Sequence, residues 1–301
     1  MVNGSLMKPF ASFMRIACTT VLSLCAATAV NSQPAAWRAT HPAYDTEISV
    51  IGSIHLLRES DYPLPDIVDT LYARANKVIF EIDLDDINAA QMQSTLLRAA
   101  MLENDTELKD IIDPALYSDA REQAQLYGID IELLSQFEPW FVAVSMLSFG
   151  MNNLGYRSEY GIEQYILAQA IRDGKEVIGA ESLADQVGVF DSLSAAEQAA
   201  LLEQTLQELG RSEEIMASMV DAWREGRLDE LQGELLGEFE NFPELYTRIV
   251  VDRNTAWAGM LERLATTGER YVMVVGALHL VGEHSVIELL RARGFNVTKV
   301  P

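Results

Sequence analysis

The sequence has very little cysteine. Its two cysteines, Cys18 and Cys25, both lie within the first 33 residues. The rest of the chain can therefore form no disulfide bond and offers no cysteine nucleophile. About 270 residues remain beyond this segment, and a chain of that length can bury a sizeable hydrophobic core without covalent cross-links.

Positive charge is also scarce. The chain contains 22 lysines and arginines against 45 aspartates and glutamates, which gives a formal net charge of −23. The basic residues form no cluster along the chain. Because a phosphate backbone is bound by clustered lysine and arginine, we expect no nucleic-acid partner.

Several catalytic motifs are missing as well. The sequence has no G-x-S-x-G nucleophile elbow, no H-E-x-x-H zinc motif, no phosphate-binding P-loop and no G-x-G-x-x-G dinucleotide motif. These absences exclude the enzyme classes that depend on such motifs. Chemistry must then come from histidines and carboxylates in another arrangement.

The chain begins with the features of a secretory signal peptide. Lys8 and Arg15 supply positive charge, an apolar run follows at Ile16–Val30, and small residues lie around Ala29. The run is shorter than the roughly 20 residues of a transmembrane helix. We therefore expect residues 1–33 to be a signal peptide cleaved near Ala29, and a secreted or periplasmic protein without a stable membrane span after cleavage.

A lipoprotein is the alternative form of export. Cys25 would be the lipid-attachment residue, but Leu24 before it is bulkier than the small residue usual at such sites. The sequence alone leaves soluble export and lipid attachment open, with soluble export favoured.

Beyond residue 33, strands and helices alternate. Apolar, β-branched runs predict buried strands at 46–51, 78–82, 176–180 and 271–275. A further strand is expected at the C-terminus, at 296–300. Shorter helices are expected at 66–75 and 283–293. This alternation is typical of an α/β fold with a mostly parallel central sheet. No internal linker interrupts it, so residues 34–301 are expected to form one domain.

Two long helical stretches, 85–174 and 183–265, predict a large helical insertion in this fold. Within the first stretch, Pro139–Phe149 is apolar nearly all round, which is typical of a fully buried helix. We expect its large side chains to belong to the core and not to a ligand pocket; they are Trp140, Phe141 and Met146.

The last long helix is expected to begin near Asn241 and Pro243, because proline is favoured at the first helical position. Residues three and four apart share one face of a helix. By this spacing Arg253, Asn254 and Trp257 lie together, and we expect them on the helix surface.

The pattern G-x-x-H occurs twice, each time where a predicted strand ends. Gly52 precedes His55 in the first copy, and Gly276 precedes His279 in the second. Glycine permits a positive φ angle or the close approach of another group. Ligands of open α/β sheets bind outside the carboxyl ends of the strands, so the two histidines are expected to face one site. Either copy alone is also compatible with an ordinary loop histidine.

Two glutamates lie at comparable positions. Glu81 falls at the end of the strand predicted at 78–82, and Glu181 follows the strand predicted at 176–180. Both would bring a carboxylate to the same edge of the sheet. Alternation along a strand leaves Glu81 equally compatible with a solvated position on the opposite face.

Seven short motifs carry a family resemblance. They are Gly-Ser-Ile-His at 52–55, Phe-Glu-Ile-Asp at 80–83, Pro-Trp at 139–140, Gly-Ile-Glu at 161–163, Gly-Ala-Glu-Ser-Leu at 179–183, Arg-Asn with Trp within 253–257, and Gly-Ala-Leu-His-Leu-Val-Gly at 276–282. In order and spacing, the chain from about Trp37 to its C-terminus resembles the TraB/GumN family, which includes PrgY and Tiki-like proteins. Glu163 departs from the pattern, because the family more often has aspartate there.

The resemblance implies an α/β fold shared with erythromycin esterases and haem-uptake ChaN-like proteins, and metal-dependent proteolysis as in the Tiki branch. Carried over position by position, it implies a site of His55, Glu81, Glu181, Arg253 and His279. Neutral imidazoles suit a divalent metal such as Mn, Co or Zn. A carboxylate can act as general base on metal-bound water, and an arginine can stabilise a developing oxyanion.

We therefore expect an exported, metal-dependent hydrolase-like protein, similar to a metalloprotease, that cleaves a peptide or ester bond. Its metal ligands would be His55 and His279, and its catalytic residues Glu81, Glu181 and Arg253. Two alternatives remain open. The protein could sequester a peptide or haem-like ligand without turnover, or it could be a metal-free esterase in which one histidine is the base.

Overall fold

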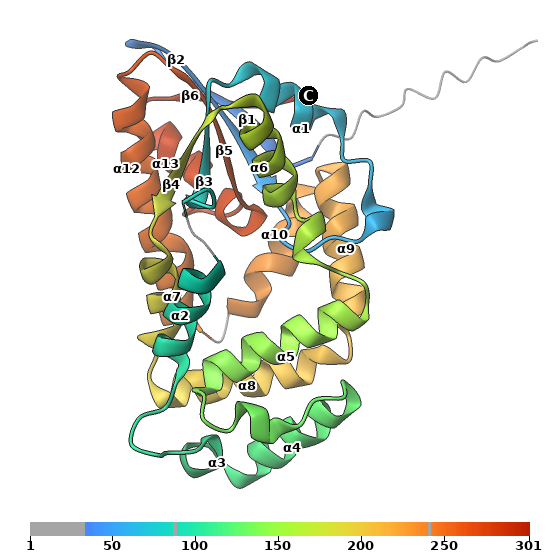
Figure 1. Cartoon of the computed structure of the whole chain (residues 1–301). Coiled ribbons are helices and arrows are strands. Elements are labelled where there is room, and N and C mark those ends of the chain that lie inside the picture. Colours follow the sequence, from blue (N-terminus) through green and yellow to red (C-terminus); the bar gives the residue numbers. More distant parts are fainter. Residues whose placement is uncertain (1–33, 87–88, 240–241) are drawn as a thin grey trace, which may run out of the picture. The chain divides into compact units, whose positions relative to one another are not determined.

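A six-stranded sheet forms the framework of the computed structural model, and helices pack around it (Figure 1). The structure describes residues 34–86, 89–239 and 242–301. The strands are β1 (Ala36–His41), β2 (Tyr44–Ser53), β3 (Lys77–Ile82), β4 (Glu176–Glu181), β5 (Arg270–Gly276) and β6 (Asn296–Lys299). Their order is β4-β3-β5-β2-β1-β6. Strand β1 is antiparallel to both of its neighbours and the other pairs are parallel, which confirms the mostly parallel sheet.

The five strands expected from the sequence are all present. In β5, the residues from Tyr271 to Gly276 are buried, because helices cover both faces of a parallel sheet and its central strands become apolar throughout. Strand β1 was missed. Its apolar residues Trp37 and Ala39 alternate with the polar Arg38 and Thr40, so it lacks the continuous apolar run of β2, β3 and β5.

Two pairs of helices cover the sheet. Helix α1 (Asp66–Arg74) is hydrogen-bonded to α6 (Ile162–Asp173), and α12 (Arg253–Ala265) packs against α13 (Val286–Ala292). The chain steps one way along the sheet from β2 to β3 to β4, and the other way from β4 to β5 to β6. Because such crossovers are right-handed, the two pairs lie on opposite faces. Helix α13 is shorter than the 283–293 expected.

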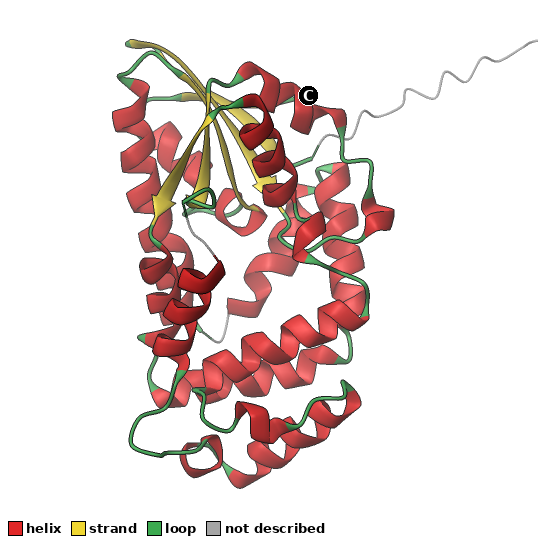
Figure 2. Cartoon of the chain, in the orientation of Figure 1, coloured by secondary structure: helices red, strands yellow, loops and turns green. Residues whose placement is uncertain are grey.

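The remaining helices form the large insertion, which is confirmed and comes in two parts separated by β4. They are α2 (Ala89–Ala100), α3 (Leu108–Ile111), α4 (Pro114–Leu126), α5 (Pro139–Asn153), α7 (Leu183–Asp191), α8 (Ala195–Leu209), α9 (Ser212–Glu225), α10 (Leu228–Leu236) and α11 (Pro243–Tyr246). Figure 2 shows the strand arrowheads pointing toward this helical region. A second core between α4, α5 and α8 supports it, and its members include Ala120, Val142, Met146 and Leu202.

Helix α5 is not buried on all sides, so that expectation was wrong. Trp140 and Met146 are buried, whereas Val144 and Leu147 keep 40 % and 43 % of their surface exposed. The two exposed residues belong to a face that lines cavities described below. Trp140 lines one of these cavities as well, so it is both a core residue and a pocket residue.

The last long helical stretch has three parts: α11, a π-helical segment at Thr247–Asp252, and α12. The predicted start at Asn241 lies outside the described residues. Asn254 and Trp257 lie together as expected, but both are fully buried, which corrects the surface position. Their face of α12 is covered because it packs on the end of β5 and the residues that follow it.

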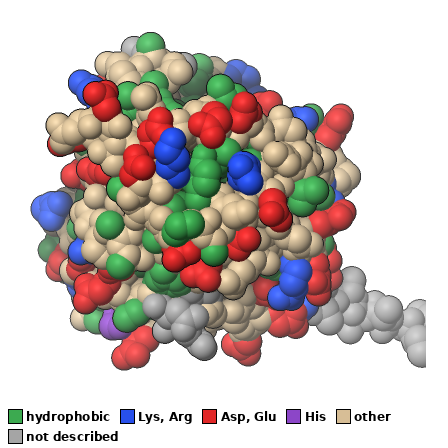
Figure 3. Space-filling model, turned by 90° about the horizontal axis from the view of Figure 1, so that it is seen from below, with side chains coloured by type: hydrophobic (Ala, Val, Ile, Leu, Met, Phe, Trp, Pro, Cys, Tyr) green, Lys and Arg blue, Asp and Glu red, His purple; other side chains and the backbone are tan. Residues whose placement is uncertain are grey.

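The predicted signal peptide, with Cys25, also lies outside the described residues. Within residues 34–301, apart from 87–88 and 240–241, no helix is long and apolar enough to cross a membrane. Figure 3 shows acidic side chains spread over one face of the protein, with lysines and arginines scattered singly among them. That face carries no basic patch of the kind that binds nucleic acid.

Candidate active site

A cavity of about 640 Å³ lies at the carboxyl ends of β2, β3 and β5. Its volume falls within the range of roughly 300–1,000 Å³ typical of small-molecule sites. The polar residues gather on the side of the sheet; they are Ser53, His55, Glu81, Gln186, Arg253 and His279. Helices α2, α5, α7, α9 and α10 contribute apolar walls, which include Met92, Trp140, Phe190, Met216, Met219 and Leu235. The two G-x-x-H histidines thus border one cavity, as predicted.

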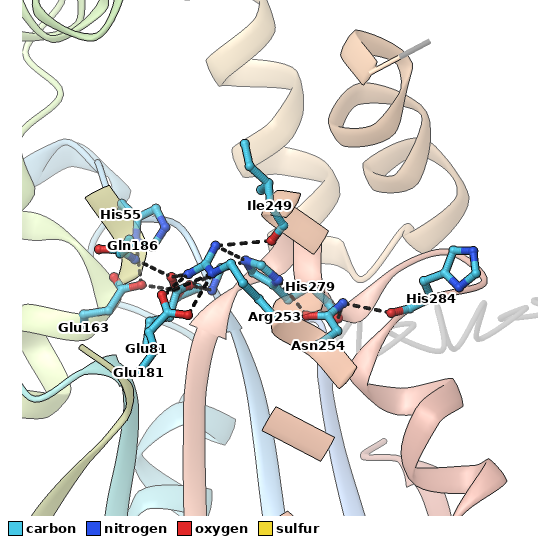
Figure 4. Close-up of polar contacts among 12 residues, drawn as sticks. His55, Glu81, Glu163, Glu181, Gln186, Ile249, Arg253, Asn254, His279 and His284 are labelled. Atoms are coloured by element: carbon cyan, nitrogen blue, oxygen red, sulfur yellow. Dashed lines mark hydrogen bonds and ion pairs between the residues drawn. The ribbon is translucent and has the colours of Figure 1, made fainter. Parts of the chain in front are cut away.

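Arg253 is the centre of the buried polar group (Figure 4). Its Nη2 donates to Glu81 at 2.6 Å and to Glu181 at 2.6 Å, and its Nε donates to Glu181 at 3.0 Å. Its Nη1 donates to the carbonyl of Ile249 at 3.3 Å and contacts Nε2 of His279 at 3.2 Å. A guanidinium has five N–H groups, so every donor of Arg253 is engaged.

The helix geometry explains how Arg253 reaches this position. It is the first residue of α12 and directly follows the π-helical segment, in which backbone bonds skip one extra residue. The backbone carbonyl of Ile249 accepts a hydrogen bond from Nη1 of Arg253. π-Helical turns occur frequently at functional sites.

Glu81 is 7 % exposed and accepts three hydrogen bonds. One comes from the backbone N–H of Gly276 at 2.8 Å, and the others come from Arg253 and from Gln186 at 2.9 Å. Burial alone would raise the pKa of this carboxyl. The positive charges of His55 and Arg253 and the hydrogen bond from the Gly276 N–H oppose burial and hold the pKa of this carboxyl below its usual range. Glu81 is therefore a buried carboxylate and not a solvated residue.

Glu181 faces Arg253 and does not line the cavity. Burial raises its pKa despite the two-pronged contact with the guanidinium, and the neighbouring charge of Glu81 acts in the same direction. Arg253 thus separates two carboxylates that would otherwise repel each other.

His279 is buried, with 3 % of its surface exposed. Its Nδ1 lies 2.7 Å from Oδ1 of Asn254, whose amide in turn donates to the backbone carbonyls of His279 and His284. An arginine can only donate, so Nε2 accepts from Arg253 and Nδ1 carries the proton. Burial lowers the pKa of His279 to about 3, and the ring is neutral.

His55 stands apart from this buried group. Its Nδ1 lies 2.7 Å from Oε1 of Glu163, which also accepts a hydrogen bond from the hydroxyl of Ser53. The side chain of His55 is 62 % exposed, whereas that of Glu163 is 12 % exposed. The negative charge of Glu163 raises the pKa of His55 to about 9, against the opposing effect of desolvation.

Gly276 lies between His55 and Glu81, and its lack of a side chain lets these two residues approach each other. A Cβ atom there would lie 3.2 Å from Nε2 of His55 and 3.3 Å from Oε1 of Glu81. At Gly52 a Cβ would lie 3.2 Å from the Cβ of Ala35. Gly276 has a φ of −48° and Gly52 is not in the left-handed region, so close approach and not a positive φ explains both glycines.

The donor set does not fit a divalent metal as it is arranged. Within the described residues, no three histidine, cysteine, aspartate or glutamate side chains are placed to hold an ion. The Nε2 lone pair of His279, Oε2 of Glu81 and both carboxylate oxygens of Glu181 point at the guanidinium of Arg253. A cation would have to displace this guanidinium.

Comparison with known proteins agrees with the resemblance that the motifs carry. The TraB/PrgY/gumN family matches residues 35–299. The chain belongs to this family. It is 28 % identical over 258 residues to the uncharacterized protein YbaP of Escherichia coli strain K12 and to that of Shigella flexneri, with 84 % of this chain and 93 % of each relative covered. An uncharacterized protein of Treponema pallidum is 23 % identical over 264 residues, which cover 82 % of this chain and 77 % of the relative. No solved structure matches the chain significantly.

Four of the five site residues expected from the sequence line the cavity, Glu181 contacts it only through Arg253, and the structure adds four more residues. Glu163, Ser53, Asn254 and Gln186 hold His55, His279 or Glu81 in place. Three of the four lie in the motifs that carry the family resemblance, so a signal was present. Gln186 lies outside them and could not have been found from the sequence.

Proposed function

We propose that the protein is an exported hydrolase that cleaves an ester or peptide bond with a water molecule activated by His55. The observation that carries the proposal is the His55–Glu163 pair at the rim of an apolar cavity. Glu163 engages Nδ1, and Nε2 lies over Gly276 among the lining residues of the cavity. An imidazole held by a carboxylate, with its second nitrogen toward the substrate, is the arrangement of a general base.

In the proposed reaction, Nε2 of His55 takes one proton from water while the water oxygen attacks the carbonyl carbon. The tetrahedral intermediate then collapses, the bond to the alcohol or amine breaks, and the imidazolium returns the proton to the leaving group. Glu81, whose Oε1 lies over the same glycine, accepts a hydrogen bond from the attacking water.

Arg253 takes the role of a positioning residue in this proposal. Its five donors hold Glu81, Glu181, His279 and the carbonyl of Ile249. Direct stabilisation of an oxyanion, the role expected from the family resemblance, would cost it one of these hydrogen bonds. Its positive charge still offsets negative charge that develops nearby.

A divalent metal stays a prediction of the sequence. Its ligands would be His55 and His279, with Glu81 or Glu181 completing the shell, and it would polarise the scissile carbonyl and lower the pKa of bound water. Since the guanidinium of Arg253 holds three of these groups, no step of the proposed reaction is assigned to a metal.

The test compares two histidine variants on chromogenic esters and on internally quenched peptides. His55→Gln should lower kcat/KM by about 10²–10⁴-fold, which is the usual contribution of a general base. His41→Gln is the matched control, because that ring stacks on Tyr44 away from the cavity. Equal activity of the two variants would refute the role of His55.

A binding protein without turnover is the second candidate, and the apolar walls of the cavity favour it. Such a protein would retain an apolar ligand, and neither esters nor peptides would be cleaved by the wild type. Measuring ligand binding and hydrolysis on the same preparation separates the two functions.

A further inference from the structure

A second apolar cavity adjoins the first. It has a volume of about 320 Å³ and lies between α5, α8, α9 and the α11–π-helical stretch. Five side chains line both cavities: Val144, Phe190, Met216, Met219 and Ile249. The two spaces therefore share a wall to which these five residues contribute.

The dividing side chains can move at low cost. Met216 and Met219 of α9 are only partly buried, and methionine is unbranched with three rotatable bonds. Val144 is 40 % exposed on α5. Rotation of the two methionines is the simplest way to join the cavities into one channel that leads away from His55.

The joined space has one polar end. Charged side chains lie at the end formed by the sheet, and the lining beyond the methionines is largely apolar, with Ala143, Leu147, Met151, Leu201 and Leu245 among its members. The hydroxyl of Thr205 donates its hydrogen bond to the carbonyl of Leu201 in its own helix. Polar groups return only with residues such as Gln204 and Glu208, which also border a surface groove.

The largely apolar lining of the second cavity favours an acyl chain over a peptide as its ligand. Each residue of a bound peptide would bring an N–H and a C=O group that need hydrogen-bond partners, and an unpaired buried polar group is costly. An acyl chain needs only apolar contact. The polar end of the cavity, where His55 and Arg253 are among the lining residues, suits the carbonyl head of such a molecule.

We propose that the substrate is an amphiphile with a long unbranched acyl chain, whose carbonyl lies at His55 and whose chain passes Met216 and Met219 into the second cavity. This inference rests on the proposed hydrolase function. It goes beyond that function by choosing the acyl ester over the peptide and by assigning the second cavity to the distal part of the chain.

The experiment measures hydrolysis of p-nitrophenyl acetate, butyrate, octanoate and laurate by the full mature chain. Wild-type kcat/KM should rise by up to about fourfold for each methylene that becomes buried. Thr205→Phe fills the second cavity, so it should lower the laurate value about tenfold or more and leave the butyrate value within about twofold. Thr255→Phe is the control, since Thr255 makes the same bond within its own helix and is exposed.

A displacement assay with a dansyl-labelled long-chain fatty acid separates the two proposals. Displacement of the probe by laurate, weakened by Thr205→Phe, supports the acyl-chain site even when no ester is cleaved; that result would overturn only the hydrolase function. Hydrolysis that does not depend on chain length overturns the acyl-chain site and leaves the hydrolase standing. Peptides that displace the probe as well as laurate does would overturn the choice of an acyl chain. Wild-type chain-length dependence decides the inference even if Thr205→Phe does not fold.

Discussion

The polar floor of the cavity has two halves that differ in how completely their hydrogen bonds are satisfied. In the half around Arg253, Glu81 and His279, the donors of the arginine are all engaged and the side chains are almost fully buried. In the half around His55 and Glu163, the imidazole is bonded through Nδ1 and is largely exposed. The first half is built to hold its shape, and the second retains a free nitrogen for a ligand.

This difference shows that residue type alone does not identify the reacting group. An arginine between two glutamates and a histidine looks like catalytic machinery in a sequence. In the fold, the arginine offsets buried negative charge that would otherwise oppose folding.

Removal of the positive charge of Arg253 should mainly destabilise the folded protein. Arg253→Met leaves Glu81 and Glu181 buried without a partner, and we expect the free energy of unfolding to fall by about 3–5 kcal/mol in urea titrations. Arg248→Met is the control, because Arg248 donates only to Ser192 near the surface and should cost about 1 kcal/mol at most. An Arg253→Met protein that is fully stable but inactive would show that Arg253 takes part in the reaction and would contradict its role as a positioning residue.

The activity should depend steeply on pH. Glu163 raises the pKa of His55 to about 9, and a general base must be neutral, so kcat/KM should rise about tenfold per pH unit up to about pH 9 and then level off. Glu163→Gln removes the main cause of the raised pKa and should move this limb toward lower pH. A limb that stays near pH 9 in that variant would mean that another group titrates.

The same pair has an opposite effect on stability. His55 gains a partner on folding and its pKa is raised, so the pair stabilises the fold fully below the ordinary histidine pKa of about 6.5. This contribution is lost as the pH rises through about 9. Activity and the stabilisation by the pair should therefore change in opposite directions over this interval, and Glu163→Gln should abolish both trends.

A single methyl group at Gly276 should impair the site without unfolding the protein. The φ angle of −48° accepts alanine, but its Cβ would lie 3.2 Å from Nε2 of His55 and must displace the ring. We expect Gly276→Ala to lower kcat/KM about tenfold, since small misplacements of catalytic groups are costly. Gly259→Ala is the control, because its Cβ would meet only Arg263 at 3.7 Å. Unchanged activity in Gly276→Ala would separate the two halves functionally.

The smallest effect is expected from metals. If Arg253 keeps the donors of the site engaged, added Mn, Co or Zn should leave the Tm of the protein unchanged, because only a ligand that binds the folded state raises it. Chelation should likewise leave the activity intact. A rise in Tm that is abolished by His279→Gln would restore the metal mechanism and would require the guanidinium to move aside.

Continuous apolar runs made most of the fold predictable. The runs in β2, β3 and β5 are largely buried, so local sequence and final environment agree, and β4 is a partly buried edge strand that its apolar run still marked. The glycines that end β2 and β5 then placed His55 and His279 at one edge. Strand β1 was not predictable in the same way, because its place in the sheet depends on pairing with β2 and β6 and not on its own composition.

The roles within the site were harder to predict than its members. The five donors of Arg253 meet groups from β3, β4, the π-helical segment and the residues after β5, and no spacing along one helix reveals such a set. Glu163 was visible in a motif but had no assigned partner until α6 brought it to His55. Three-dimensional contacts therefore decided which histidine is free and which is buried.

The central position of β5 has a consequence for the order of folding. Strand β5 lies between β3 and β2, and without it the sheet divides into β4 with β3 and β2 with β1 and β6. It also ends in Gly276 and precedes His279, which both line the cavity. Its partner β2 is far away in the sequence, so this pairing carries a large loop-closure entropy and belongs to the slow class of contacts. A ribosome must have passed residue 276 before the two half-sheets can join, and the site is assembled in that same step.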